Sequence, residues 1–509
     1  MNNLLTKDTK YLIFLTLLYF AISLVGILHH EFFIDEAHHW LLARDSNSIS
    51  ELIQNTRIEG HPLLWSLMLY GISRFTFDPF WMQFLHILIS TSVVFLLLKK
   101  GPFNWLFKTL FIFGYFMIFE YNLISRNYSL GILFLFLACS IFKNREQKFS
   151  LICIYLALTT NSHLLFSVIA FALFLTLLFE QIQNKQFLKE QFITGYFIFA
   201  LGLLLIYIQI HSTDSNWLLD PINRLPFQER IVGGFVSFFK GIITVPDFRT
   251  IHFWNSNLFV NLSKPIAAVF ALLIYFLPLL IFFKNRKTLF FIYTGLIGAQ
   301  VFFFVTQRAA TRFHGMTFIL IIVALWIEHY YSSEDSKLRR FLNSLRLTLL
   351  VKPIMYAILI IHFASGIYAY SMDYIYPFSS AKETISYIDK SDFNKIEIIT
   401  VTCDGTLLCA YLEKKVYFLC EQSLQSFCHW DNECSGNVTQ EKSVLMLTDY
   451  MKNKDGKSVL FVSYYPLTND TNTKNWVSLN DKIKVRFVKR FDQNIVDKTS
   501  YYVFEVAQK

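Results

Sequence analysis

The most polar stretch of the N-terminal half runs from Glu31 to Asp45 and contains two adjacent carboxylates and two adjacent histidines. Asp35 or Glu36 could act as a general base, since a carboxylate within hydrogen-bonding reach of a hydroxyl can accept its proton. The same pair could instead only cap a helix, because carboxylates are favoured at helix N-termini. His38 and His39 alone do not predict a transition-metal site, because adjacent histidines point to different sides of a helix.

Arginines and histidines recur in four later segments, each beside an apolar run. These segments are Glu59-Gly60-His61-Pro62, Ser125-Arg126-Asn127-Tyr128-Ser129-Leu130-Gly131, Asn161-Ser162-His163 and Arg312-Phe313-His314-Gly315, with Arg308 shortly before the last. Guanidinium groups stay charged and can hold phosphate oxygens with two hydrogen bonds. A single arginine at a membrane boundary usually only reaches toward the headgroups, so the arginines predict an anion site only in combination.

The elements that must position these residues are membrane helices. Of the 509 residues, 54% are hydrophobic and only 16% are charged, whereas soluble domains are near one quarter charged. Many apolar runs approach the roughly 20 residues that cross a bilayer, and we expect about eleven to thirteen spans. The net charge of +9 comes mostly from short basic clusters between these runs, which is typical of cytoplasmic loops rather than of nucleic-acid binding.

The basic clusters also predict which segments face outward. The rule that positive loops stay inside puts residues 29–61, 121–126, 163, 211–249, 307–314 and everything after Tyr370 on the extracytoplasmic face. Arg126, Arg308 and Arg312 are then expected on the same side as Asp35. Residues 62–77 and 80–98 look like two spans where the rule allows an odd number, so either one of them is partial or re-entrant, or Lys99 and Lys100 lie outside. Tyr121, Tyr128, Trp217 and Trp254 are expected to form an interfacial aromatic belt.

The chain is expected to divide into a membrane module, residues 1–372, and a soluble extracytoplasmic α/β domain, residues 373–509. Within the first, residues 29–61 form the first outward loop and 211–249 a long one. In the second, helical spacing around 381–388 and 444–451 alternates with strand patterns at 396–401, 416–418, 459–463, 483–487 and 501–506. Its five cysteines favour a disulfide among Cys420, Cys428 and Cys434, with one cysteine left over.

The order of these motifs resembles a known family. Asp35-Glu36 with Trp40 and Arg44, then Glu59-Gly60-His61-Pro62 before a span, is similar to the first loop of C-type membrane glycosyltransferases, the bacterial relatives of protein O-mannosyltransferases and aminoarabinose transferases. Ser125 to Gly131, Arg312 to Gly315, Ala410-Tyr411-Leu412 and Cys428 to Asp431 extend the resemblance over most of the chain. It implies a polytopic helical fold, a polyprenyl-phosphate sugar donor and a bacterial inner-membrane location.

The resemblance also implies roles for individual residues. Asp35 is expected to be the general base, with Glu36 as the alternate. Four groups are expected to hold the donor phosphate and four to contact the substrate: Arg126, Arg308, Arg312 and His314, and Glu59, His61, Tyr128 and His163. Transfer to a glycan, lipid or protein would invert the anomeric carbon, and no metal or other cofactor is expected. The alternative is a transporter or flippase of a lipid-linked glycan, which should carry ionisable residues near the bilayer midplane.

Overall fold

The protein folds into two compact units. Unit 1 comprises Met1–Leu28, Gly60–Trp65 and Gln83–Ser371, and unit 2 comprises His29–Glu59, Ser66–Met82 and Met372–Lys509. The computed structural model describes residues 6–57, 59–210, 225–306, 310–332, 340, 347–429, 434, 438–454, 456–468 and 475–509. Unit 2 therefore combines most of the segment predicted as the first outward loop, and the stretch Ser66–Met82, with the C-terminal part of the chain.

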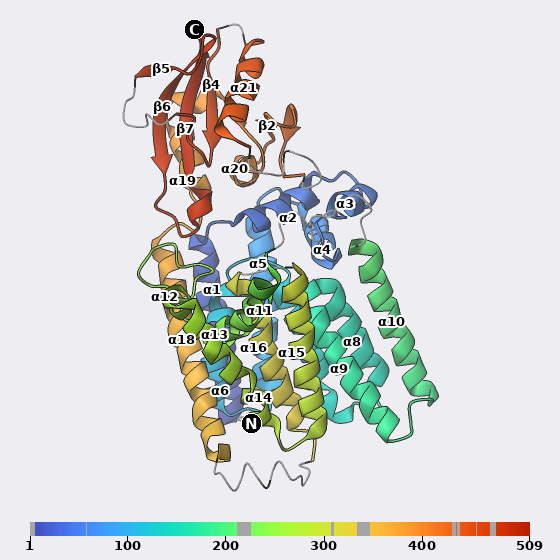
Figure 1. Ribbon diagram of the computed structural model, residues 1–509. Coiled ribbons are helices and arrows are strands. Elements are labelled where there is room, and N and C mark those ends of the chain that lie inside the picture. Colours follow the sequence, from blue (N-terminus) through green and yellow to red (C-terminus); the bar gives the residue numbers. More distant parts are fainter. Residues whose placement is uncertain are drawn as a thin grey trace, which may run out of the picture. The chain divides into compact units, whose positions relative to one another are not determined.

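Long apolar helices make up most of unit 1 (Figure 1). In the described part of the chain, eight helical segments are long and apolar enough to cross a membrane. They are α1 (Lys7–His29), α5 (Phe80–Lys100), α9 (Leu164–Gln183), α10 (Glu190–Ile210), α13 with α14 (Lys264–Tyr275, Leu277–Phe282), α15 (Arg286–Thr306), α16 (Thr311–Glu328) and α18 (Val351–Ile375). The prediction of a polytopic helical membrane protein is confirmed, because each segment matches the length that a bilayer requires.

Three further apolar helices are shorter, namely α4 (Leu64–Ser73), α7 (Tyr128–Ser140) and α8 (Phe149–Ser162). With 10 residues, α4 rises about 15 Å, roughly half of the hydrocarbon core. The two apolar runs that follow His61 are therefore unequal, one a half-length helix and the other, α5, a 21-residue helix. This inequality agrees with the possibility, left open above, that one of the two runs is only partial.

Of the eight candidate spans in the described part of the chain, α16 is the most enclosed, with 83% of its apolar stretch buried. It packs against α15, α7 and α11 (Phe227–Ile242). Gly241 of α11 is required at this contact, because a Cβ there would lie 2.4 Å from the carbonyl oxygen of His314.

The segment predicted as a long loop, 211–249, is helical over α11, while its residues 211–224 lie outside the described part. The remaining elements are α6 (Trp105–Ile112), η1 (Phe116–Glu120), η2 (Phe142–Asn144), α12 (Leu258–Leu262) and η3 (Leu347–Leu350).

Unit 2 is built on a seven-stranded mixed sheet with the strand order β3-β2-β1-β4-β7-β6-β5. The strands are β1 (Glu397–Thr400), β2 (Val416–Phe418), β3 (Ser423–Gln425), β4 (Val459–Ser463), β5 (Trp476–Ser478), β6 (Ile483–Phe491) and β7 (Tyr501–Gln508). β1 pairs in parallel with β2 and β4, and the other pairs are antiparallel. The helices are α2 (Ile34–Asp45), α3 (Ile49–Thr56), α19 (Ala381–Lys390), η4 (Asp392–Lys395), α20 (Gly405–Leu412), α21 (Gln440–Met451) and η6 (Asp497–Thr499).

The core of this sheet follows the alternation of the strands. Ile399, Phe461 and Phe504 point to one face, where Leu447 and Met451 of α21 cover them. All five strands and both helices expected from the sequence are present, and the C-terminal sheet is confirmed. β3, β5 and α20 were not predicted, because each is too short to show a period.

Two disulfides cross-link unit 2. Cys420 bonds to Cys434, which is one of the predicted pairings, and Cys403 bonds to Cys428, which was not predicted. Cys409 is the cysteine left over, and it is buried. Burial raises the pKa of its thiol to about 12, so it stays protonated.

Candidate functional site

Arg126 and three of the other predicted site residues come together in unit 1. Arg126 is 3% exposed, and its Nη2 lies 3.2 Å from Nε2 of His61. The ring of His163 lies 5.9 Å from that of His61 and stacks at 4.3 Å on the ring of Tyr128. These residues come from three separate stretches of the chain, so their meeting is a result of the fold.

Local hydrogen bonds explain why these stretches meet. The side chain of Asn127 donates to the carbonyl of Ser162 at 2.7 Å, which ties the start of α7 to the end of α8. The hydroxyl of Ser129 donates to the carbonyl of Tyr121. Gly131 allows α7 to approach α9 closely, since a Cβ there would lie 2.9 Å from the ring of Phe166. The polar residues of the Ser125–Gly131 motif therefore hold Arg126 and Tyr128 in place.

His163 has a defined tautomer. Its Nδ1 accepts a hydrogen bond from the backbone N–H of Leu165 at 3.0 Å, so His163 caps α9. Burial, together with the positive charges of Arg126 and Arg312, lowers the pKa of His163 well below its usual value. The ring is consequently neutral, and its proton is on Nε2. That nitrogen is buried and has no hydrogen-bond partner among the described residues. A buried donor of this kind is costly unless a ligand satisfies it.

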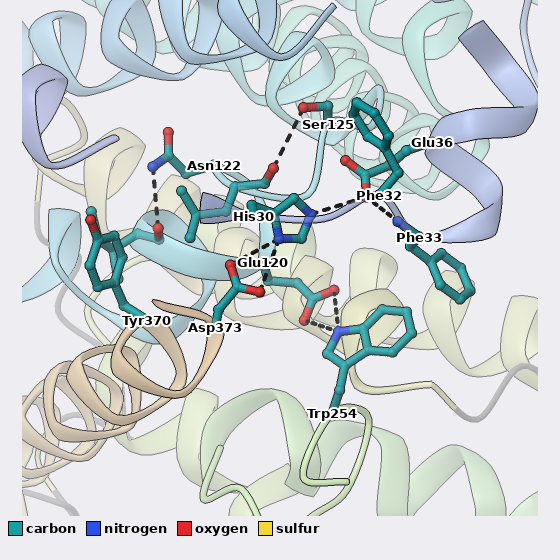
Figure 2. Close-up of polar contacts among 12 residues, drawn as sticks. His30, Phe32, Phe33, Glu36, Glu120, Asn122, Ser125, Trp254, Tyr370 and Asp373 are labelled. Atoms are coloured by element: carbon teal, nitrogen blue, oxygen red, sulfur yellow. Dashed lines mark hydrogen bonds and ion pairs between the residues drawn. The ribbon is translucent and has the colours of Figure 1, made fainter. Parts of the chain in front are cut away.

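Arg312 lies in the first turn of α16 and is held by aromatic residues. Its guanidinium lies 5.1 Å from the ring centre of Trp254, whose indole N–H donates to Glu120 at 3.2 Å (Figure 2). The hydroxyl of Tyr121 donates to the Arg312 carbonyl at 2.8 Å. Gly315 is required one turn further on, because a Cβ there would lie 2.3 Å from that hydroxyl. Arg312 is thus fixed at the positive end of a long helix.

We call His61, Arg126, His163 and Arg312 the anion cradle. The charges of both arginines act on His163, and their combined effect is seen in its lowered pKa. A neutral imidazole N–H, two guanidinium groups and a helix N-terminus are all suited to an anion. The charge and donors at this position therefore favour an anion, and electrostatic interactions in a buried setting are stronger than in water.

Three aromatic residues were predicted incorrectly. Tyr121 and Tyr128 are 0% and 1% exposed and Trp254 is 9% exposed, so they are interior residues and not an interfacial belt. Tyr121 stacks on Tyr128 at 5.0 Å, and Tyr128 on His163. The prediction failed because tyrosines of an interfacial belt and tyrosines of the interior both lie at the ends of apolar runs in the sequence. Trp217 lies outside the described residues.

Glu120 was missed by the sequence reasoning. It is 1% exposed and accepts hydrogen bonds from Tyr115 at 3.1 Å and from Trp254. A lone carboxylate within an apolar run is an unusual residue, and that signal could have identified it. Of the other expected phosphate ligands, His314 is buried with its ring 4.8 Å from that of Phe303, and Arg308 lies outside the described residues.

The polar stretch of residues 31–45, which we call the acidic loop, lies in unit 2 and takes part in a buried charge cluster (Figure 2). His30 lies between two carboxylates, with Nε2 3.2 Å from Glu36 and Nδ1 2.9 Å from Asp373. Burial alone would lower the pKa of His30, but Asp373 and Glu36 outweigh it and raise the pKa to about 10. Glu36 also accepts from the backbone N–H of Phe33 at 2.8 Å, which is the half of a capping box that a residue at this position can supply. The carboxylate of Glu36 thus holds the start of α2 against His30.

Asp35 precedes Glu36 in the first turn of α2 and is half-buried. The same loop is held at two other points. Glu59 lies 2.5 Å from Nε2 of His38, and the Phe32 N–H donates to the Tyr411 hydroxyl at 2.9 Å. The expected substrate residue Glu59 is therefore engaged with a histidine that the sequence left unassigned. Asp35 thus stands on a loop that is fixed at both ends within unit 2.

Glu31 was not singled out from the sequence, although it opens the acidic loop. Its Oε2 is enclosed and has no hydrogen-bond partner among the described residues. Burial raises the pKa of Glu31 to about 8, against the opposing effects of Lys382 and His30.

In the part of the chain that the structure describes, no group of three or more histidine, cysteine or carboxylate side chains is arranged to hold a metal ion. Comparisons of the chain with protein-family models, with curated proteins and with solved structures find no match.

Proposed function

We propose that this protein is a membrane glycosyltransferase of the C-type fold, which transfers a sugar from a polyprenyl-phosphate donor to a glycan, lipid or protein acceptor. The observation that carries the proposal is the anion cradle of unit 1. It offers a sugar phosphate two guanidinium groups and a buried imidazole N–H. A departing phosphate needs positive charge and hydrogen bonds rather than a proton from a general acid.

Asp35 is the proposed general base. It would take the proton of the acceptor hydroxyl while the oxygen attacks the anomeric carbon opposite the phosphate, which inverts that carbon. The burial of Glu36 and its bonds to His30 and Phe33 favour Asp35 over Glu36 for this role. Glu36 would act as a positioning residue that fixes the start of α2.

An apolar groove in unit 1 suits the lipid part of the donor. It has a volume of about 560 Å³, and the described residues that line it are all apolar, among them Ile242, Leu273, Phe276, Leu280, Ile354 and Ile361. Ile242 follows Gly241, which packs against the carbonyl of His314 on α16. The groove thus begins beside the helix that carries Arg312, as a phosphate with an attached polyprenyl chain would require.

The two disulfides support an extracytoplasmic location for unit 2, because disulfides persist in oxidising compartments. Together with the resemblance to bacterial transferases, they favour a bacterial inner membrane with the acidic loop facing outward.

The test is transfer from radiolabelled polyprenyl-phosphate sugars to membrane lipids and glycans by the purified protein in nanodiscs. Asp35→Asn and Glu36→Gln are compared with Glu51→Gln, a matched control that removes a carboxylate from the neighbouring helix α3. We expect Asp35→Asn to abolish transfer while the control keeps it. Loss only in Glu36→Gln would move the base by one residue. No transfer from any donor by the folded protein would overturn the proposal in favour of a lipid-linked glycan transporter.

A further inference from the structure

The sheet of unit 2 contains a topological switch point. From β1 the chain passes through α20 to β2 on one side, and it later returns through α21 to β4 on the other side. Both neighbours run parallel to β1. When consecutive crossovers leave in opposite directions, a crevice opens beyond the carboxyl ends of the two central strands, and ligands of open α/β sheets bind there.

A pocket of about 140 Å³ lies at this position. Thr402 and Asp404 line it from the segment after β1, and Ser463, Tyr464 and Tyr465 from the end of β4 and the segment after it. The start of α21 closes it with Gln440 and Ser443. We call it the switch-point pocket. Its volume is that of a small ligand, comparable with one sugar ring.

The walls of the switch-point pocket are held by bonds within unit 2. The carboxylate of Asp404 accepts from the N–H of Thr402 at 2.9 Å, and its carbonyl accepts from the hydroxyl of Tyr501 at 2.6 Å. Gln440 donates to the carbonyl of Leu467 at 2.7 Å, and the neighbouring Cys403 is fixed by its disulfide to Cys428. A pocket formed in this way is ready for a ligand without rearrangement, which reduces the entropic cost of binding.

The chemistry of the lining selects a class of ligand. Among the described residues that line the pocket there is no lysine, arginine or histidine, so an anion would find no counter-charge from them. The lining combines hydroxyl and amide groups with aromatic rings. The polar groups belong to Thr402, Ser443, Ser463 and Gln440, and the aromatic Tyr465 is 54% exposed. A pyranose ring matches this surface, because its apolar C–H face packs on an aromatic ring while its hydroxyls exchange hydrogen bonds.

We infer that the switch-point pocket binds one neutral sugar residue of a glycan. This inference deepens the proposed function, on which it rests, by naming the acceptor as a glycan that unit 2 recognises. The carboxylate of Asp404 is engaged by the Thr402 N–H, and burial raises its pKa. A single sugar in so small a site would bind with a Kd on the order of 1 mM, and a longer glycan would add contacts outside the pocket.

The test is saturation-transfer NMR on the full-length protein in nanodiscs, without sugar-based detergents that would compete. The probes are methyl glycosides of glucose, mannose, galactose and N-acetylglucosamine. Tyr465→Ala removes the rim aromatic, and Ser443→Leu fills the pocket. Trp476→Ala is the matched control, since this residue is a 39% exposed aromatic on β5, outside the pocket. Thermal unfolding checks that each variant folds.

We expect at least one glycoside to bind, Tyr465→Ala to weaken it about tenfold, Ser443→Leu to abolish it, and Trp476→Ala to leave it unchanged. No binding of any probe, or binding that neither pocket variant alters, would overturn the inference. Donor turnover is measured in the same samples. Transfer without sugar binding would remove the inference and keep the transferase, whereas Tyr465-dependent binding without transfer from any donor would remove the transferase and keep the pocket.

Discussion

Arg145 on the one hand and Arg126 with Arg312 on the other lie in different surroundings within unit 1. Arg145 donates two hydrogen bonds of 2.7 Å to Glu180, which also accepts from Lys287 at 2.9 Å and from Tyr331 at 3.3 Å. Arg126 contacts a histidine nitrogen, and Arg312 lies over an indole ring. In the first cluster, the cations of Arg145 and Lys287 bind the carboxylate of Glu180. In the second, burial and the positive charges of Arg126 and Arg312 lower the pKa of the neutral His163 ring.

The difference separates structural charge from functional charge. The carboxylate of Glu180 has both oxygens satisfied by two cations and a tyrosine hydroxyl. Its bond to Lys287 links α9 to α15, and removing the carboxylate would leave two cations without their partner. The Nε2–H of His163 has no hydrogen-bond partner among the described residues, so a ligand that accepts from it would also interact with the two guanidinium groups that act on this ring. We therefore expect the Glu180 cluster to matter for folding and the anion cradle for activity.

The largest expected effect is on stability. Glu180→Gln leaves Arg145 and Lys287 together without their carboxylate, and should lower the free energy of unfolding by about 3 kcal/mol. Thermal unfolding in nanodiscs measures this loss. Transfer per folded molecule should stay within about twofold, which is a small difference in barrier. Unchanged stability would remove the contrast between the two clusters.

The next effect is on activity. Arg126→Gln should lower kcat/KM by roughly 10²–10³, the usual loss when one preorganised donor to a developing charge is removed. Arg126→Lys should recover only part of it, because an ammonium group cannot hold phosphate oxygens with two parallel bonds. Arg490→Gln on β6, at an exposed position, is the control. The contrast fails if Arg126→Gln transfers sugar normally, or if it loses activity only by unfolding.

A smaller effect on activity distinguishes the roles of the two ring nitrogens of His163, of which Nδ1 caps α9 and Nε2 carries the donor. His163→Asn keeps an acceptor that can cap α9 and removes the Nε2–H donor, so activity should fall about tenfold with little change in stability. His163→Ala loses both groups and should also lower the melting temperature. Because the pKa of His163 is lowered in the folded protein, the pH profile of the wild type should show no limb from this residue near its ordinary value of 6.5. Equal stability of the two variants would contradict the capping role.

The smallest effect extends the comparison to unit 2. Glu31 has its pKa raised from 4.5 to about 8, so the folded state holds a proton that the unfolded state releases. Stability should therefore fall as the pH rises from 4.5 to 8, and level off above that. Glu31→Gln should remove this slope and be more stable than the wild type at pH 9 by on the order of 1 kcal/mol, since the half-buried carboxylate is partly screened. Parallel pH curves of the two proteins would exclude Glu31 as the source.

The sequence predicted the elements better than their contacts. Membrane helices and the longer strands follow from apolar length and period, and the motif residues His61, Arg126, Tyr128 and His163 do gather in unit 1. The pairing of His30 with Asp373 could not be predicted, because 343 residues separate them and neither lies in a motif. The short strands and α20 were missed for a similar reason, since tertiary packing rather than local pattern determines them.

The pairing of the cysteines has a consequence for biosynthesis. The two disulfides are interleaved, since Cys403 bonds to Cys428 and Cys420 to Cys434. A chain that emerges N-terminus first presents Cys403 and Cys420 before their partners, so oxidation in order of emergence joins the wrong pair. Maturation therefore requires either delayed oxidation or a disulfide isomerase. Burial keeps Cys409 out of that exchange only once unit 2 has folded around it.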